Sequence, residues 1–160
     1  MNPKFILAVG LAFVAGVVVF SALFSINHSS VENLILQGDC NLSDHPLCEA
    51  RGNHTYSVSL GLSPRPIPLL KDIEINATVQ GLVDVRTAQV SIEGINMYMG
   101  IQIIPLAVET TDNAGQEVRL TGKMQLPVCT SSVMEWQATL RIQTENKTYQ
   151  AAFPFTTTAD

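Results

Sequence analysis

The sequence has few of the residues from which most enzyme sites are built. It contains only three histidines in 160 residues, and charged residues make up 14% of the chain. No serine–histidine–aspartate arrangement, His-Glu-x-x-His zinc motif, glycine-rich phosphate loop or catalytic pair of carboxylates can be recognised in it. We therefore predict that the protein is not an enzyme.

Basic residues are also scarce. The chain has 9 lysines and arginines against 14 acidic residues, which gives a net charge of −5, and the few basic residues form no run or patch. Nucleic acids and anionic lipid headgroups are both bound through clustered positive charge. The composition therefore argues against either of them as a partner.

Charge is missing altogether between Phe5 and Ile26. That stretch is long enough for a helix to cross a hydrocarbon core of about 30 Å. The alternative is a cleaved signal peptide, but its apolar region is normally about 7–15 residues long. The best small-residue cleavage site, Val19-Phe20-Ser21, is also a poor one. We predict an uncleaved membrane anchor over residues 1–27, and Lys4 before it places the rest of the chain outside the cytoplasmic membrane.

Helical periodicity of useful length is absent after residue 40, and apolar residues alternate with polar ones instead. The alternating segments are residues 56–62, 73–79, 88–92, 101–108, 118–124, 136–142 and 149–155. Turn-forming residues separate them, including three prolines between Ser63 and Pro68. This pattern predicts an all-β domain over residues 55–160, an immunoglobulin-like antiparallel β-sandwich of about seven strands with Trp136 in its core.

Residues 28–54 are predicted to form a tether and a cysteine-containing loop. The spacing of Val31, Leu34 and Ile35 would allow a few more turns of the anchor helix. Cys40 and Cys48 flank a stretch of loop-forming residues, and their spacing is not the Cys-x-x-Cys of a redox motif or that of a zinc knuckle.

Outside the cytoplasm, two cysteines so close in the chain are expected to pair, and we predict a Cys40–Cys48 disulfide. Two alternatives remain open. Cys129, the third cysteine, could pair with one of them. The two thiols could also stay reduced and take up copper or exchange with a partner protein.

The segment 94–100, Gly-Ile-Asn-Met-Tyr-Met-Gly, is the best candidate for a binding site. On a strand, Met97 and Met99 would lie on the same face. Thioether sulfur is a soft ligand that suits Cu(I). The pair therefore suggests part of a Cu(I) site, with a third ligand from elsewhere. The candidates for that ligand are Met124, Met134, Cys129 and a histidine of the N-terminal loop.

The alternative is that both methionines pack in the core. They share the parity of the isoleucines at positions 95, 101 and 103, which resemble a buried face. The preceding segment buries even positions, so this arrangement requires a bulge near Glu93 and Gly94. Taken alone, the residue pattern favours core packing over metal binding.

Several short motifs together resemble a group of small membrane-anchored periplasmic proteins of Gram-negative bacteria, akin to YtkA-like and FixH-like β-sandwich domains. The motifs are Cys40 with Cys48, the proline-rich residues 63–68, the methionine segment 94–100, Leu126-Pro-Val-Cys129 and Met134-Glu-Trp136. The wider group is associated with copper handling and with assembly of haem–copper cytochrome oxidases. The resemblance covers residues 40–156 and implies Met97, Met99, Cys129 and Met134 as soft ligands. This chain lacks the dense histidine and methionine clusters of strong copper scavengers.

The resemblance implies a single-pass protein of the bacterial inner membrane whose C-terminal domain lies in the periplasm. Its expected role is non-enzymatic, the binding and delivery of Cu(I) during cytochrome oxidase assembly, with an oxidase subunit or a copper chaperone as partner. A second hypothesis is a metal-free β-sandwich that docks on a membrane complex, with the methionines in its core. A third is thiol exchange through Cys40 and Cys48.

Overall fold

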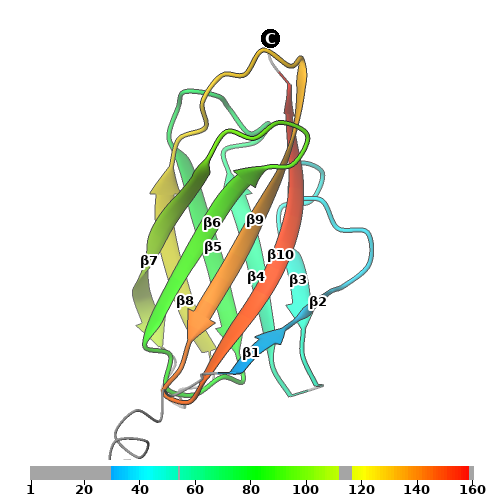
Figure 1. The fold of residues 1–160 in the computed structure, drawn as a ribbon. Coiled ribbons are helices and arrows are strands. Elements are labelled where there is room, and N and C mark those ends of the chain that lie inside the picture. Colours follow the sequence, from blue (N-terminus) through cyan, green and yellow to red (C-terminus); the bar gives the residue numbers. More distant parts are fainter. Residues whose placement is uncertain (1–29, 54, 112–116, 159–160) are drawn as a thin grey trace, which may run out of the picture.

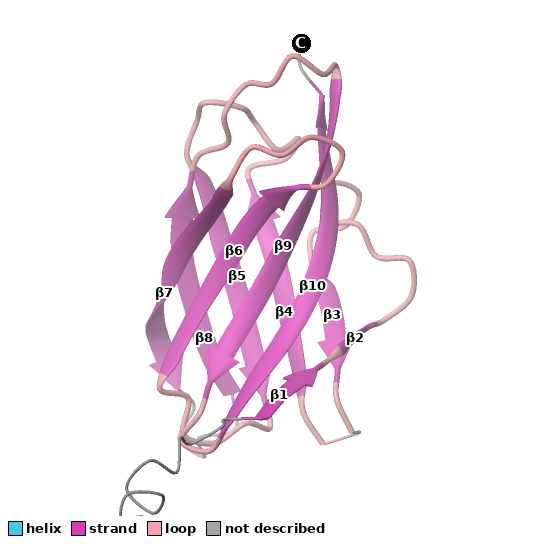
Figure 2. Cartoon of the chain, viewed as in Figure 1, coloured by secondary structure: helices cyan, strands magenta, loops and turns pink. Residues whose placement is uncertain are grey.

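The computed structural model describes residues 30–53, 55–111 and 117–158 (Figure 1). Within these ranges all regular structure is β (Figure 2). No helix in the same ranges has the length and apolar character that a membrane span requires. The predicted anchor, residues 1–27, lies outside the described residues.

The all-β prediction is confirmed, with ten strands in place of about seven. The seven strands predicted from alternation correspond to β4 through β10. The strands are β1 (Ser30–Asn33), β2 (Ile35–Leu36), β3 (Cys48–Arg51), β4 (Ser57–Ser63), β5 (Ile73–Gln80), β6 (Thr87–Gly94), β7 (Ile101–Thr111), β8 (Glu117–Met124), β9 (Val133–Gln143) and β10 (Lys147–Thr158).

The strands form one sheet in the order β1-β10-β9-β6-β7-β8-β5-β4-β3-β2, which curls round until it is nearly closed (Figure 1). Strand β1 runs parallel to β10, and the other neighbours are antiparallel. Strand β7 changes partner along its length. Its residues 101–106 pair with β6, and its later residues pair with β8 across an irregularity between Val108 and Thr110. One strand therefore joins the two halves of the sheet.

The core lies inside the curled sheet, because alternate residues of the long strands point inwards. Its largest fully buried side chains are Phe153, Phe155, Leu42, Leu60, Leu62, Ile73, Ile75, Ile92, Leu120, Leu126, Leu140 and Ile142. Burial of one such aliphatic or aromatic side chain contributes about 1.5–3 kcal/mol. Trp136 is 3% exposed and stacks on Phe155 with 6.1 Å between ring centroids, as expected of a core anchor.

The predicted helical extension after the anchor is wrong for the described residues of that segment. Val31 lies in β1 and Ile35 in β2. The outer edge of β10 offers unpaired backbone groups, which β1 takes up in parallel register, starting with Ser30 beside Lys147. This long-range pairing outweighs the weak helical spacing of three apolar residues.

The prediction of which β7 residues point into the core is also wrong. Ile101 and Ile103 are 57% and 60% exposed, whereas Ile104 and Leu106 are buried. The preceding residues 95–100 form a loop, so the alternation of β6 does not continue into β7. The apolar face that we expected to be buried is therefore on the surface.

Candidate metal-binding loops

Met97 and Met99 lie in the loop that connects β6 to β7, residues 95–100, and not on a strand. Their spacing therefore does not by itself place the two thioethers on one face. Met97 is half-buried and packs against the core, and Met99 is 37% exposed. The expectation that both methionines lie in a buried row with Ile95 is not met, because Ile95 is 55% exposed.

The β6–β7 loop is fastened to the start of β9 by three hydrogen bonds. The backbone N–H of Ile95 donates to the carbonyl of Glu135 at 2.8 Å. The side-chain amide of Asn96 donates to the carbonyl of Val133 at 3.0 Å and accepts from the backbone N–H of Glu135 at 3.1 Å. The Asn96 side-chain amide thus donates and accepts as a backbone peptide group of a neighbouring strand would. It extends the hydrogen bonding between β6 and β9 into the loop.

Gly94 is the point around which the methionine segments meet. It pairs with Trp136 at the end of β6. A Cβ built on Gly94 would lie 2.3 Å from the carbonyl oxygen of Met97 and 3.1 Å from Cε of Met134. Only glycine leaves room for both groups. The absence of a side chain at position 94 therefore lets the backbone of the loop and the end of the Met134 side chain both approach this residue closely.

Cys129 lies in the neighbouring connection, residues 125–132 between β8 and β9, at the same end of the sheet (Figure 1). It is a free, half-buried thiol that packs against the core. The hydroxyl of Ser131 donates to the Val133 carbonyl at 2.7 Å, the same oxygen that accepts from Asn96. The two loops are therefore joined through one carbonyl group.

The four predicted ligands thus lie on segments that meet at one end of the sheet, with different exposure. Met134 is 3% exposed, Met97 and Cys129 are half-buried, and Met99 is the most accessible. Met124, the other methionine considered, is buried at the end of β8 beside Ile73. His28 and His54 lie outside the described residues.

Beside these loops is an apolar pocket of about 240 Å³. Its lining includes Met99, Leu126, Pro127 and Trp136. Large apolar side chains of the two loops and the strands next to them are exposed. They are Ile95, Tyr98, Ile101, Ile103, Val128 and Val133, and Tyr98 is 81% exposed. This end of the molecule therefore combines soft ligands with apolar surface.

The Cys40–Cys48 disulfide is confirmed, and it leaves Cys129 free. His45 lies in the loop between the two cysteines. Its ring nitrogen and both sulfur atoms all lie within 4.8 Å of one another, so this Cys-His-Cys group could hold a metal ion. The sequence signal for this group is a histidine between two cysteines, although the spacing matches no standard zinc motif.

An ionic cluster lies at the end of the sheet opposite to the methionine loop. The Glu32 carboxylate of β1 accepts hydrogen bonds from Nζ of Lys147 and from the hydroxyl of Tyr56. The Lys147 ammonium, and then Tyr56, hold the pKa of Glu32 below its usual value. The same carboxylate raises the pKa of Lys147 and raises that of Tyr56 to about 12. Tyr56 lies just before β4. The cluster therefore connects β1, the first strand in the order of the sheet, to a segment next to β4, which lies near the other end of that order.

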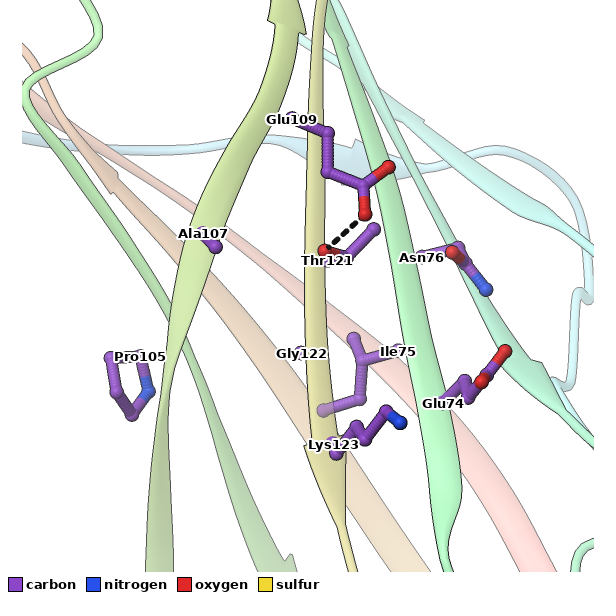
Figure 3. Close-up of a pocket in the computed structure, with 9 residues that line it drawn as sticks. All are labelled: Glu74, Ile75, Asn76, Pro105, Ala107, Glu109, Thr121, Gly122 and Lys123. Atoms are coloured by element: carbon purple, nitrogen blue, oxygen red, sulfur yellow. Dashed lines mark hydrogen bonds between the residues drawn. The ribbon is translucent and has the colours of Figure 1, made fainter.

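A surface pocket of about 400 Å³ opens where β7 changes partner (Figure 3). Glu74, Glu109 and Lys123 lie around it, and Glu109 accepts a hydrogen bond from the Thr121 hydroxyl at 3.0 Å. Among the residues described, no buried side-chain nitrogen or oxygen lacks a hydrogen-bond partner. This pocket therefore shows no unsatisfied polar group held ready for a ligand.

No protein-family model and no curated protein sequence matches the chain.

Proposed function

We propose that the protein is a non-enzymatic accessory protein that binds Cu(I) in the periplasm and passes it on during assembly of a cytochrome oxidase. An N-terminal helix would hold it in the bacterial inner membrane, and an oxidase subunit or a copper chaperone would be its partner. The observation that carries the proposal is the meeting of the β6–β7 loop with the start of β9 at Gly94, beside Met97 and Met134.

The chemistry of these side chains suits a monovalent copper ion. Thioether sulfurs are uncharged and soft, which favours Cu(I) over harder ions. A thiolate from Cys129 would add one negative charge and balance that of the ion. Because Met99 is accessible while Met134 is buried, such a site would be open on one side and could exchange its ion with a partner.

The immunoglobulin-like type of sandwich is part of the same proposal. It is supported by the way in which the sheet divides at β7, since one half then holds β6, β9 and β10 and the other β8, β5 and β4. An antiparallel sheet that folds over on itself and encloses one core is the arrangement that such domains use. Its loops gather at the two ends, where sites are commonly built.

A metal-free docking module is the second candidate. It is favoured by the exposed apolar side chains on and near the methionine loop, because exposed apolar surface at the end of a domain is a feature of docking sites. The two functions are compatible, since transfer of a metal ion also requires contact with the recipient.

The test is a Cu(I) competition titration of the full-length protein with its disulfide intact. Wild type is compared with the Met97→Leu, Met99→Leu double variant, in which leucine keeps the side-chain volume but removes the sulfur. Met124→Leu is the matched control, because it removes a buried thioether at the end of β8 that is not one of the four proposed ligands. We expect one equivalent of Cu(I) for wild type and for Met124→Leu, and a loss of at least about tenfold in affinity for the double variant.

Equal affinity in all three proteins would refute the assignment of the loop methionines. Absence of binding in wild type would leave the docking module as the better account. In that case, cross-linking from Tyr98 in intact membranes should identify the partner complex.

A further inference from the structure

We propose that the loop between β2 and β3 forms a second, redox-gated metal site, in which Cys40, His45 and Cys48 bind Zn²⁺ once their disulfide is reduced. The three ligand atoms already lie within 4.8 Å of one another in the disulfide form. Two cysteines and one histidine, with a fourth position left to water or to a partner, are an established ligand set for zinc. This site is separate from the methionine loops and uses none of their residues.

The loop is held in place by contacts that do not involve the disulfide. Leu42 is completely buried in the core, and its backbone N–H donates to the carbonyl of Pro154 at 2.9 Å. The Ser43 hydroxyl donates to the Thr156 carbonyl and accepts from the Thr156 backbone N–H, both at 2.7 Å. These bonds attach the loop to β10, so its shape should survive reduction of the disulfide.

Close packing on β4 fixes the other side of the loop. A Cβ on Gly61 would lie 2.6 Å from the carbonyl oxygen of Pro46, so the loop backbone rests directly on that strand. Arg65 also donates to the carbonyl of Asp44 at 2.8 Å. Cys48 itself belongs to β3 and pairs with Leu60. The two thiols and the imidazole would therefore remain close together, which is what a preorganised site requires.

His45 has a hydrogen-bond partner of the kind that metal-bound histidines commonly have. Its ring Nδ1 lies 3.2 Å from the carbonyl oxygen of Asn41. A carbonyl can only accept, so Nδ1 carries the hydrogen and Nε2 has the free lone pair. A backbone carbonyl on the second ring nitrogen is the usual partner that sets the tautomer of a zinc ligand. His45 is also solvent-exposed, which gives an ion a path of entry.

Opening of the site requires a dithiol donor. Its thiolate attacks one sulfur of the Cys40–Cys48 bond, and its second thiol resolves the mixed disulfide. The donor leaves as a disulfide, and the chain gains two electrons and two protons as two thiols. Binding of Zn²⁺ then releases both thiol protons to solvent, and two thiolates and one neutral imidazole bind the ion. Oxidation of the thiolates by a disulfide of the same class reverses both steps and releases the ion.

Zinc is the informative probe, because thioether ligands favour Cu(I) and do not suit Zn²⁺. The full-length protein is reduced with a phosphine under anaerobic conditions, the phosphine is removed, and Zn²⁺ is titrated against a chromophoric chelator. Cys129 is a free thiol in both the oxidised and the reduced protein, so their difference reports only on the cysteine loop. We expect one equivalent of Zn²⁺ in the reduced form and none in the oxidised form.

His45→Ala in the reduced protein should weaken Zn²⁺ binding by at least about tenfold, because it removes one of three ligands. The matched control is Asp39→Ala, an exposed acidic residue of the same loop, which should bind as wild type. The Met97→Leu, Met99→Leu variant should also bind Zn²⁺ normally, so that failure of the copper proposal leaves this result unaffected.

The proposal is overturned if the reduced protein binds no Zn²⁺, or if His45→Ala binds it as tightly as wild type. Circular dichroism of the reduced, metal-free protein is recorded in parallel. Loss of its β signal would also overturn the proposal, since the site depends on a loop that keeps its shape without the disulfide.

Discussion

The side-chain amide of Asn96 lies 3.1 Å from the backbone nitrogen of Glu135 and accepts its hydrogen bond. The same amide donates to Val133, so it binds one residue on each side of Met134. The β6–β7 loop is thereby held against the strand that carries a predicted copper ligand.

Replacement of Asn96 by alanine should loosen this loop. Two exposed hydrogen bonds are lost, each worth about 0.5–1.5 kcal/mol, so we expect a decrease of about 1–3 kcal/mol in the free energy of unfolding. Cu(I) affinity should fall as well, because Met97 would no longer be held near Met134. Urea unfolding and the Cu(I) titration measure the two effects.

The control for this variant is Asn76→Ala. Asn76 is exposed on β5, and its side chain makes no hydrogen bond to any residue that the structure describes. An Asn96 variant as stable as this control would contradict the structural role of the amide.

Gly94→Ala should also displace the β6–β7 loop. The new methyl group would meet the Met97 carbonyl oxygen at 2.3 Å, a distance that the backbone can relieve only by moving. Overpacking of this kind costs about 1–3 kcal/mol, and the loop should be displaced outwards. Thermal unfolding and Cu(I) affinity should both be reduced, whereas Ser91→Ala on the same strand should leave both near wild type. Normal copper affinity in Gly94→Ala would show that the site does not depend on this contact.

The buried hydrogen bond from Trp136 to Thr157 gives a separate test of the core. Nε1 of the indole donates to the threonine hydroxyl at 2.9 Å, and Thr157 is only 5% exposed. Thr157→Val keeps the shape but leaves the indole N–H without a partner, which should cost about 1–3 kcal/mol in urea unfolding. Thr157→Ser keeps the hydroxyl and should cost less. Equal stability of the valine and serine variants would argue against this hydrogen bond.

The Glu32 cluster should make stability depend on pH at both ends of the range. The pKa of Glu32 is lowered below 4.5, chiefly by Lys147, so its contribution is present above that pH and is lost as pH falls through the folded-state value. The pKa of Tyr56 is raised from 10.0 to about 12, so its contribution is present below pH 10 and is lost as pH rises towards 12.

Glu32→Gln should therefore flatten the acid side of the stability profile, and Tyr56→Phe the alkaline side. Glu74→Gln removes a carboxylate from β5 without touching this cluster and is the control. Urea unfolding between pH 3 and pH 11 measures these effects. An unchanged acid side in Glu32→Gln would contradict the assignment.

Strands β4 to β10 could be predicted because burial of every second residue leaves a local pattern in the sequence. Ile73, Ile75, Val90 and Leu140 all lie inside the core as their positions indicate. Strand β3 also alternates, with Cys48 and Ala50 buried, but it has only four residues. Strands β1 and β2 have no such pattern. Strand β1 exists because it pairs with β10, more than a hundred residues away, and such pairing leaves no local signal.

The candidate sites were likewise predictable only in part, from local residue chemistry and not from long-range packing. Residue chemistry alone singled out Met97, Met99, Cys129 and Met134, but the turn that brings their segments together depends on Gly94 and on the Asn96 amide. Likewise, the Cys40–Cys48 disulfide could be predicted from the short spacing of the two cysteines and the expected compartment. The position of His45 beside it could not, because that depends on how the loop packs on β4 and β10.

The outer edge of β10 is covered twice, by β1 along residues 147–150 and by Leu42 and Ser43 beside residues 154–156. An uncovered edge of this length would be a template on which the strand of another copy could add. Such additions are the first step of fibre growth. The cysteine loop therefore protects the chain against polymerisation. A protease cut within it should expose this edge of β10 and promote aggregation.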